Sequence, residues 1–540
     1  MRTRHKQQFE TVPMPTSNVS ISNIGKYQYV YHIGKGYRNK NGKPTSERFS
    51  IGKLSETGML IPNENYFEIY HQTPKPVSFE VDSIANFGDF FLMDRIAQDI
   101  GLSKVLRNVY GETGDEILML AIYLSLTGQA LYRCDNWCRE TLTGRKKVIT
   151  SQRCSRILES LNEPKRMGFF RAWVHARQQH EYLAYDVTSI SSYARGNDLV
   201  EYGYNRDKEK LPQVNLGMYY GEESMLPIFY CTYQGSIVDK SHLRYIMQYN
   251  ERLGIKDVCF VMDRGFFSED NVRSLAFKHR FIVGLSNGLG LSKDVINKYG
   301  NLVTSSRYDI GLTGVKGIAI EDERYDFRSN VHLFYANSKV ADEERIFKEK
   351  LLHWERALSE GKSVKESEGY FTVTDTDVRT IERNHDAIDE KIRNLGYFLM
   401  MTTDLRKTPE DVLDIYRRKD IIEKSFDELK NDLDMKRLRV HSEDTTEGKM
   451  FVAFVGLILR TYFHNKMKEY LDANRPISMP QIFDELRMIK TVKTKSGMLL
   501  HNPLTKKQRT ILEQFGLAED DITYAILKYD GGNDFFDTFT

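Results

Sequence analysis

Apolar residues follow two different spacings along the chain, and each change of spacing marks a change of predicted structure. Residues 83–180 carry apolar positions three and four residues apart, as in D-E-I-L-M-L-A-I-Y-L-S-L, which is the period of a helix. After Glu181 the apolar positions form short runs with turn residues between them, which is typical of strands. The pattern therefore predicts a helical region followed by a mixed α/β region.

The α/β region begins with three strand-like runs, E-Y-L-A-Y-D-V-T-S-I, Q-V-N-L-G-M-Y-Y and L-P-I-F-Y-C-T-Y. A helix from Lys240 to Leu253, the strand D-V-C-F-V-M-D, a helix capped by Ser268 and the strand F-I-V-G-L come next. This order predicts a mixed sheet in residues 181–294. Asp186 lies inside the first strand of that sheet, and Asp263 ends the fourth.

Residues 295–395 break this order with strand-like runs and one highly charged helix, so we expect a β-rich insertion. The α/β domain resumes in residues 396–470, where Thr408 is placed to cap a helix with Pro409 at its first position. Its run M-F-V-A-F-V-G-L-I-L is far shorter than the roughly 20 residues of a membrane span and predicts a buried helix. Residues 471–540 predict a helical end with basic patches such as K-T-V-K-T-K, able to contact DNA or a second copy.

Two regions before the α/β domain are candidates for contact with DNA. Residues 1–80 predict a small β module from the runs Y-Q-Y-V-Y-H-I, R-F-S-I-G-K-L and Y-F-E-I-Y, with the basic loop G-K-G-Y-R-N-K-N-G-K. In residues 81–180 the basic connector R-E-T-L-T-G-R-K-K precedes a helix that Thr150 or Ser151 can cap, which is compatible with a helix-turn-helix. A plain β module and two helices that only pack together are the alternatives.

Composition narrows the class of protein only a little. The 540 residues carry 28% charged and 40% hydrophobic residues and a net charge of +2, which is ordinary for a cytoplasmic protein and neither requires nor excludes nucleic acid. Five scattered cysteines are an odd number, which argues against a disulfide framework and favours a reducing compartment. The first residues are not followed by the apolar segment of a signal peptide, and we expect no membrane contact.

The segment Y-R-R-K-D-I-I-E-K-S-F-D-E-L-K, residues 416–430, has the spacing of an amphipathic helix. Its apolar residues are Ile422, Phe426 and Leu429, on one face. Tyr416, Glu423 and Lys430 are seven residues apart, so two helical turns place them in one row. A surface helix with salt bridges explains this segment taken by itself equally well.

Two further acids change that balance. An aspartate in or after an apolar strand is costly unless it is paired, hydrogen-bonded or bound to a metal ion. Asp186, Asp263 and Glu423 together supply three hard oxygen ligands of the kind that Mg²⁺ and Mn²⁺ prefer. The alternatives are turn-forming aspartates at the first two positions and a surface charge at the third.

These motifs resemble the DDE transposases of bacterial insertion sequences, and most of all insertion-sequence family four with its sixteen-thirty-four-like branch. The signature of that group is Tyr, two residues, Arg, three residues, Glu, six residues, Lys. Tyr416, Glu423 and Lys430 match it, while Lys419 stands at the Arg position, a role that Arg417 or Arg418 can take. The stretches around Asp186 and Asp263 and the segment G-Y-N-R-D-K-E-K-L-P-Q-V-N-L-G are also similar, so the resemblance covers about residues 180–465.

The resemblance implies a ribonuclease H-like catalytic domain and a two-metal-ion mechanism with Mg²⁺ or Mn²⁺ held by Asp186, Asp263 and Glu423. It implies cleavage of double-stranded DNA at the transposon ends, joining of the 3′ ends to target DNA, and a homodimer on DNA. Family members can flip a base onto an aromatic residue; Trp354 is available, although a packing role suits it better. A metal-dependent nuclease of the same fold and a non-catalytic DNA-binding descendant are the alternatives. We expect phosphate contacts from six residues: Tyr416, Lys419, Lys430, Arg417, Arg418 and Arg264.

Overall fold

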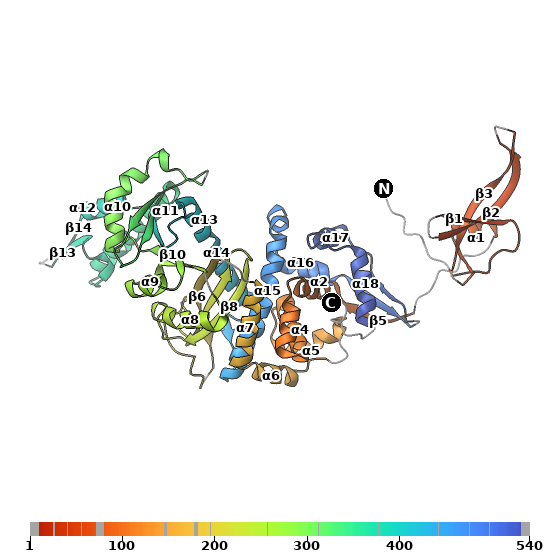
Figure 1. Cartoon of the computed structure of the whole chain (residues 1–540), viewed down its shortest axis with the longest axis horizontal. Helices are drawn as coiled ribbons and strands as arrows, with labels where there is room; N and C mark the ends of the chain where they lie inside the picture. Colours follow the sequence, from red (N-terminus) through yellow and green to blue (C-terminus); the bar gives the residue numbers. More distant parts are fainter. Residues whose placement is uncertain are drawn as a thin grey trace. The chain divides into compact units, whose positions relative to one another are not determined.

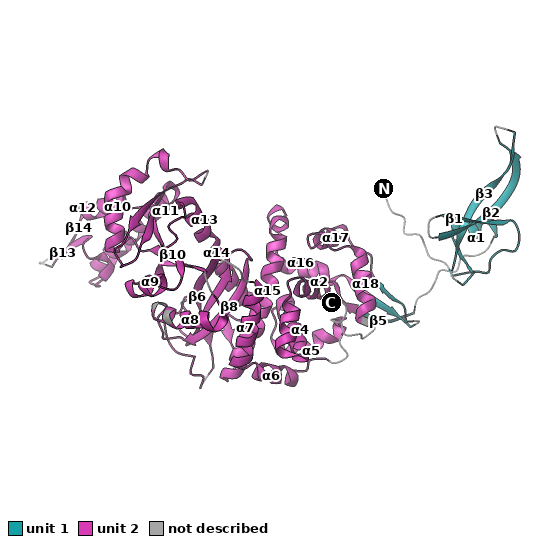
Figure 2. Ribbon diagram, viewed as in Figure 1, with its two compact units in different colours: residues 1–84, 492–500 teal, residues 85–491, 501–540 magenta. Residues whose placement is uncertain are grey.

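The chain folds into two compact units, Met1–Ile84 with Val492–Leu500 and Ala85–Thr491 with His501–Thr540 (Figure 2). Parts of two predicted basic loops, Lys40 with Asn41 and Arg145 to Lys147, lie outside the described residues. The computed structural model describes residues 10–24, 27–39, 42–55, 57–71, 80–144, 148–177, 182–194, 196–255, 258–311, 313–375, 379–440, 442–474, 476–495 and 497–530.

The first unit contains an antiparallel sheet in the order β1-β2-β3-β4. The run Y-F-E-I-Y, expected as a strand, forms the helix α1 instead, because the Asn63 side chain accepts a hydrogen bond from the Tyr66 backbone N–H and starts a helix there. Tyr66 and Phe67 of this helix pack with the apolar residues on one face of the sheet. The elements are β1 (Val19–Ile24), β2 (Tyr27–Arg38), β3 (Pro44–Leu54), β4 (Leu60–Pro62) and α1 (Glu64–Ile69).

Helices from both ends of the chain share one core in the second unit. The Ser125 hydroxyl on α4 donates to the Gly456 carbonyl on α15 at 3.1 Å, and a Cβ on Gly456 would meet that hydroxyl oxygen at 2.9 Å. Arg487 pairs with Asp89 at 2.9 Å, and Thr150 caps α6 as expected. The N-terminal helices are α2 (Gly88–Asp99), α3 (Leu102–Tyr110), α4 (Glu112–Thr127), α5 (Cys134–Glu140), α6 (Ser151–Ser160) and α7 (Glu163–Arg177); the C-terminal ones are α15 (Glu443–Ala473), α16 (Met479–Arg487), α17 (Lys506–Glu513) and α18 (Glu519–Asp530).

A nine-stranded mixed sheet forms the centre of the α/β region (Figure 1). Its order is β11-β12-β15-β10-β9-β6-β7-β8, and β16 pairs with the end of β6. As predicted, β6, β7 and β8 form an antiparallel meander, and β9 runs parallel to β6. The strands are β6 (Tyr182–Ser192), β7 (Gln213–Gly221), β8 (Leu226–Gln234), β9 (Cys259–Met262), β10 (Arg280–Leu285), β11 (Val315–Asp322), β12 (Ser329–Ala336), β15 (Tyr397–Thr402) and β16 (Arg437–Leu438).

The region expected as an insertion is continuous with this sheet. β11 pairs with β12 and β12 pairs with β15, so the region expected as an insertion contributes two strands to the main sheet. Sequence period identifies strands but does not reveal their partners. The separate part is a two-stranded sheet, β13 (Phe371–Asp375) and β14 (Arg379–Arg383), beside α11 (Asn337–Ser359) and α12 (His385–Arg393). Trp354 packs there, its ring 6.0 Å from that of Tyr370.

The C-terminal region also contains strands that we did not expect. The segment K-T-V-K-T-K contains β17 (Lys490–Thr494), whose β-branched residues Thr491, Val492 and Thr494 favour a strand. It belongs to a three-stranded sheet with β18 (Leu499–His501) and β5 (Val81–Asn86). Among the described residues no single helix is long and apolar enough to cross a membrane. One bent pair of helices, Glu112–Thr127 with Leu131–Glu140, is long and apolar enough when the two are taken together.

Because His332 on β12 is buried, we expect the protein to lose stability at acidic pH. Its side chain is fully buried, neither ring nitrogen has a hydrogen-bond partner among the described residues, and burial lowers its pKa to about 4 from 6.5. The free energy of unfolding therefore includes a contribution from the neutral histidine that is fully present above pH 6.5. This contribution, about 3 kcal/mol, is lost as the pH falls from 6.5 toward 4. Chemical unfolding of His332→Leu and of the wild-type protein should diverge across this window, and parallel curves would contradict this account.

Candidate active site

The two predicted aspartates occupy neighbouring positions on adjacent parallel strands. Tyr185 of β6 lies opposite Met262, the last residue of β9, so Asp186 and Asp263 are the next residues along the two chains. Each carboxylate accepts a hydrogen bond from the next backbone N–H, at 2.8 Å from Val187 and 3.0 Å from Arg264. The strand pairing thus brings two acids together that are far apart in sequence.

Burial and charge act differently on the two carboxyl groups. Burial raises the pKa of Asp186 above its usual value, although Lys419 and, less strongly, Arg206 oppose that change. Burial also acts on Asp263, but the Lys419 charge, the hydrogen bond from Tyr416 and the Arg264 N–H outweigh it and lower the pKa of Asp263. The Lys419 ammonium is thus a cation that acts on both carboxyl groups.

The segment that carries the signature is two helices and not the continuous one that we predicted. α13 (Pro409–Arg418) ends, and α14 (Asp420–Asn431) begins, at Lys419. The Lys419 N–H donates to the Tyr416 carbonyl, which forms a tight 3₁₀-type turn between the two helices. Thr408 and Pro409 start α13 as expected, and the predicted apolar face of α14 is buried.

Tyr416, in the last turn of α13, and Lys419, at the break, each contact one of the two aspartates. The Lys419 ammonium lies 3.6 Å from Asp186 Oδ2 and only 5% of the residue is exposed. The Tyr416 hydroxyl donates to Asp263 Oδ1 at 2.8 Å, and burial together with Asp263 raises the pKa of this tyrosine. Gly284 on β10 leaves room for that hydroxyl, since an added Cβ would meet its oxygen at 3.0 Å.

Glu423 lies in the first turn of α14, one turn after Lys419, with its side chain exposed. No group of three His, Cys, Asp or Glu side chains is close enough to hold a metal ion within the part of the chain that the structure describes. The structure therefore brings together Asp186, Asp263, Tyr416 and Lys419, while Glu423 remains at the surface beside them.

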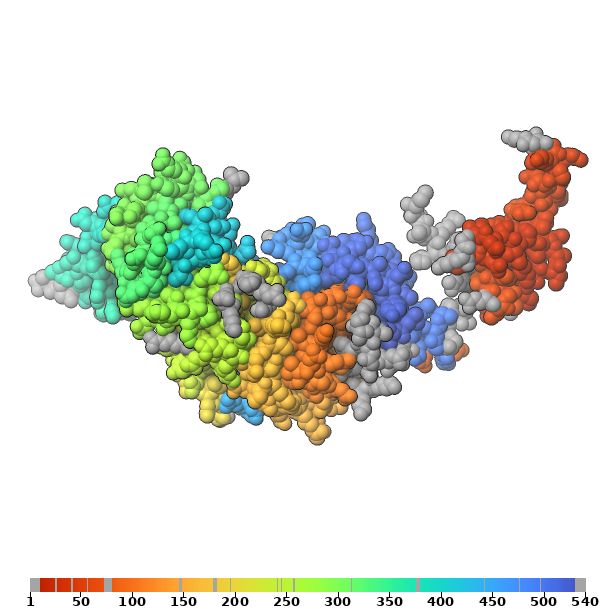
Figure 3. Space-filling view, in the orientation of Figure 1, coloured from red at the N-terminus to blue at the C-terminus, as the bar shows by residue number. Residues whose placement is uncertain are grey.

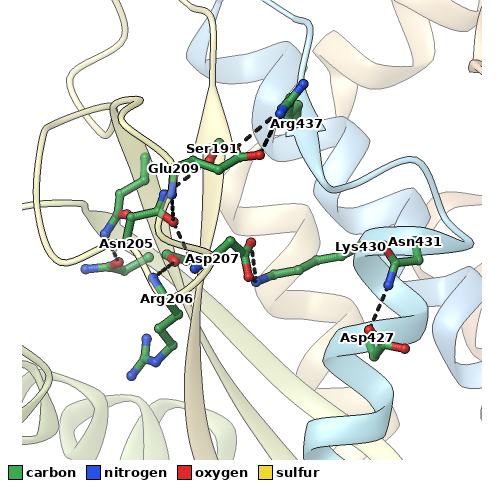
Figure 4. A network of polar contacts seen from close by, with 12 residues as sticks. Ser191, Asn205, Arg206, Asp207, Glu209, Asp427, Lys430, Asn431 and Arg437 are labelled. Atoms are coloured by element: carbon green, nitrogen blue, oxygen red, sulfur yellow. Dashed lines mark hydrogen bonds and ion pairs between the residues drawn. The ribbon is translucent and has the colours of Figure 1, made fainter. Parts of the chain in front are cut away.

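Lys430, the last residue of the signature, is held by a residue that the sequence did not single out. Its ammonium contacts both oxygens of Asp207, at 2.9 and 2.8 Å, and the lysine is 9% exposed (Figure 4). Two other acids near it in the sequence pair with other lysines, Asp420 with Lys424 and Asp434 with Lys449. Lys430 is thus a fixed link between α14 and the segment that follows β6.

The segment around Asp207 is attached to β6 through its neighbours. The Asn205 amide donates to the Ser191 hydroxyl at 3.1 Å, and the Arg206 N–H donates to Ser189 at 2.9 Å (Figure 4). Glu209 forms an ion pair with Arg437 at 2.6 Å next to β16. The signal in the sequence is the run N-R-D-K-E, in which basic and acidic side chains alternate and which belongs to a segment that carries the family resemblance.

Comparison with known proteins decides the family. A family model described as "Transposase DDE domain" matches residues 177–459, more than half of the chain. The chain belongs to the DDE transposase family. A search of curated proteins finds no match. Among solved structures, the piggyBac transposase synaptic complex with hairpin DNA aligns with 82% of this chain and 76% of its own chain, at 10% identity and a TM-score of 0.33.

The residues expected to bind DNA in this transposase divide into two sets by their surroundings. Tyr416, Lys419 and Lys430 are engaged with carboxylates and are largely buried. Arg264, Arg417 and Arg418 are exposed. The three arginines are thus more accessible to a ligand than Tyr416, Lys419 and Lys430.

The pair between Asp207 and Lys430 predicts a measurable coupling energy. Asp207→Asn and Lys430→Met each leave one partly buried charge without its partner, so each should lower the free energy of unfolding by about 2 kcal/mol, whereas the double variant should lose less than the sum of the two. Denaturant unfolding measures this cycle. The exposed pair Lys424 and Asp420 on the same helix is the matched control and should show a coupling near zero. Strict additivity at Asp207 and Lys430 would show that their contact contributes nothing.

Proposed function

We propose that this transposase cleaves DNA at the ends of an insertion sequence and joins the freed 3′ ends to target DNA by phosphoryl transfer. The observation that carries the proposal is the pair Asp186 and Asp263, adjacent on parallel strands within the matched domain. Two carboxylates fixed side by side by backbone pairing can hold divalent cations, and such cations would neutralise the charge on phosphate oxygens.

The strand order supports a ribonuclease H-like catalytic domain. In β8-β7-β6-β9-β10, three antiparallel strands are followed by two strands parallel to β6. Asp186 lies on the central strand of these five and Asp263 directly after its parallel neighbour.

The donor set fits Mg²⁺ or Mn²⁺ at its two aspartates. Both are hard oxygen donors, and Asp186 is largely buried with a cationic ammonium against its free oxygen, so the site already favours a positive charge. Asp186 and Asp263 would hold two metal ions together with Glu423, whose exposed carboxylate on α14 follows Lys419 by one turn. Such ions, when bound, activate the attacking oxygen and stabilise the leaving one.

The remaining side chains of the site orient these groups and bind the substrate. Tyr416 fixes Asp263 Oδ1 by its hydrogen bond, and Asp207 fixes α14 through Lys430. We assign the phosphate contacts beside the scissile bond to Arg264, Arg417 and Arg418, whose side chains are exposed. The two ends of an insertion sequence must be cut together, so we propose a homodimer on double-stranded DNA.

A cleavage and joining assay tests this function. The substrate is a duplex that carries the inverted repeats flanking the gene, with Mg²⁺ or Mn²⁺ and a supercoiled target plasmid. Metal-dependent cutting at the repeat ends followed by joining to the plasmid supports the proposal. Cutting without joining would identify a nuclease instead, and DNA binding without cutting would identify a non-catalytic DNA-binding protein.

A further inference from the structure

The hairpin of the first unit continues beyond the sheet to which it belongs. β1 pairs with β2 only over Tyr27 to His32, and β4 pairs with β3 only over Gly52 to Leu54. The remaining part of the hairpin, residues 34–48, has no third strand beside it among the described residues, and it projects from the unit (Figures 1 and 3). We call this part the basic ribbon.

The ribbon concentrates positive charge. Its sequence contains Lys35, Arg38, Lys40, Lys43 and Arg48 against one acid, Glu47. All of these that the structure describes are exposed, as is Tyr37 at 54%. A two-stranded ribbon adds no apolar core to the unit, and its like charges repel one another. Stability of the unit therefore does not explain the concentration of positive charge.

The charges of the first unit are separated between its two sides. The exposed acids Glu64 and Glu68 lie on α1, which covers one face of the sheet. The register places Tyr27 and Tyr29 on the other face with Lys53, whose ammonium lies 4.3 Å from the centre of the Tyr27 ring and 5.3 Å from that of Tyr29. Phenol and ammonium groups therefore continue the donor surface from the ribbon onto the sheet.

We propose that the basic ribbon binds duplex DNA by entering the major groove, with the adjoining tyrosine and lysine face on the phosphate backbone. A two-stranded antiparallel ribbon has the width that the major groove admits. Lysine, arginine and tyrosine are donors that proteins use for phosphates. The register shift between Ile33 and Gly36 bends the ribbon away from the sheet, which exposes both of its edges. The inference rests on the proposed transposase function and assigns the first unit a binding role in it.

The test compares two full-length triple variants in an Asp263→Asn background, so that binding is measured without cleavage. The ribbon variant carries Lys35→Gln, Lys43→Gln and Arg48→Gln; Arg38 is left in place because it bonds to the Gly42 carbonyl in the turn. The matched control removes three exposed lysines from the other unit, Lys350→Gln, Lys365→Gln and Lys391→Gln. Fluorescence anisotropy with a labelled linear DNA duplex is recorded over a series of salt concentrations.

The ribbon variant should bind the duplex at least about tenfold more weakly than its background, with a salt slope smaller by about two to three units, while the control should change little. Equal loss in both variants would show that only net charge matters and would overturn the inference, as would unchanged affinity and slope in the ribbon variant. Loss of binding to anionic vesicles without loss of duplex binding would assign the ribbon to a membrane and would also overturn it. If the wild-type protein failed to join DNA ends while the ribbon variant still bound DNA more weakly than its background, only the proposed reaction would be contradicted.

Discussion

Asp263→Asn is expected to abolish strand cleavage while leaving DNA binding intact. Asparagine keeps the shape of the side chain, and it can still accept hydrogen bonds from Tyr416 and from the Arg264 N–H, which lie 2.8 and 3.0 Å away. It loses the charge that would hold a divalent ion next to Asp186. We expect cleavage to fall by at least about a thousandfold, because residues that act as a catalytic unit fail together.

Cleavage of an end-labelled duplex and anisotropy of the same duplex measure the two properties separately. Asp389→Asn, an exposed acid on α12, provides the matched control and should cut at the normal rate. A variant at Asp263 that cuts normally would remove this residue from the catalytic assignment. Equal loss of cutting and binding would mean that the substitution disturbs the fold.

Lys419→Met is expected to destabilise the protein strongly and to make it dependent on divalent ions. The lysine is 5% exposed, and it is the shared cation beside Asp186 and Asp263. Removal of one partner from a buried charge cluster leaves uncompensated charge, which typically costs about 3 kcal/mol. Mg²⁺ then replaces the missing positive charge, so its addition should raise the melting temperature of the variant more than that of the wild type.

Thermal unfolding with and without Mg²⁺, under otherwise identical conditions, measures this effect. Lys391→Met removes an exposed lysine on α12 and should leave both the melting temperature and its response to Mg²⁺ unchanged. If Lys419→Met melts like the wild type and gains nothing from Mg²⁺, the lysine does not neutralise the aspartates.

The sequence predicted local elements well because their causes are local. The meander, the strands that carry the two aspartates and the helix starts at Thr150, Ser268 and Thr408 all follow from period and capping residues. The predictions that were wrong depended on which strands pair with each other or on a single capping contact. The membership of β11 and β12 in the main sheet depends on pairing with β15, and the helix at Glu64–Ile69 depends on Asn63.

The site shows the same division. Strand ends and spacing identified Asp186, Asp263 and the signature residues, and the fold brings most of them together. The break at Lys419 was not predictable from spacing, because the helical period continues across it and no proline or glycine marks it. Asp207 was missed as the partner of Lys430 because the two are 223 residues apart, and only the fold makes them neighbours.

The shared core of the second unit also determines the order in which the chain can fold during its synthesis. Ser125 meets Gly456 across 331 residues, Asp89 meets Arg487 across 398, and Asp94 accepts a hydrogen bond from Tyr529 across 435. At the usual rate of elongation, a gap of this size means that α4 leaves the ribosome roughly half a minute before α15 does. Over that interval the newly made helices α2 to α4 expose the apolar faces that the end of the chain will cover. The nascent transposase is therefore most open to aggregation, and most in need of chaperones, between the synthesis of its first helices and its last.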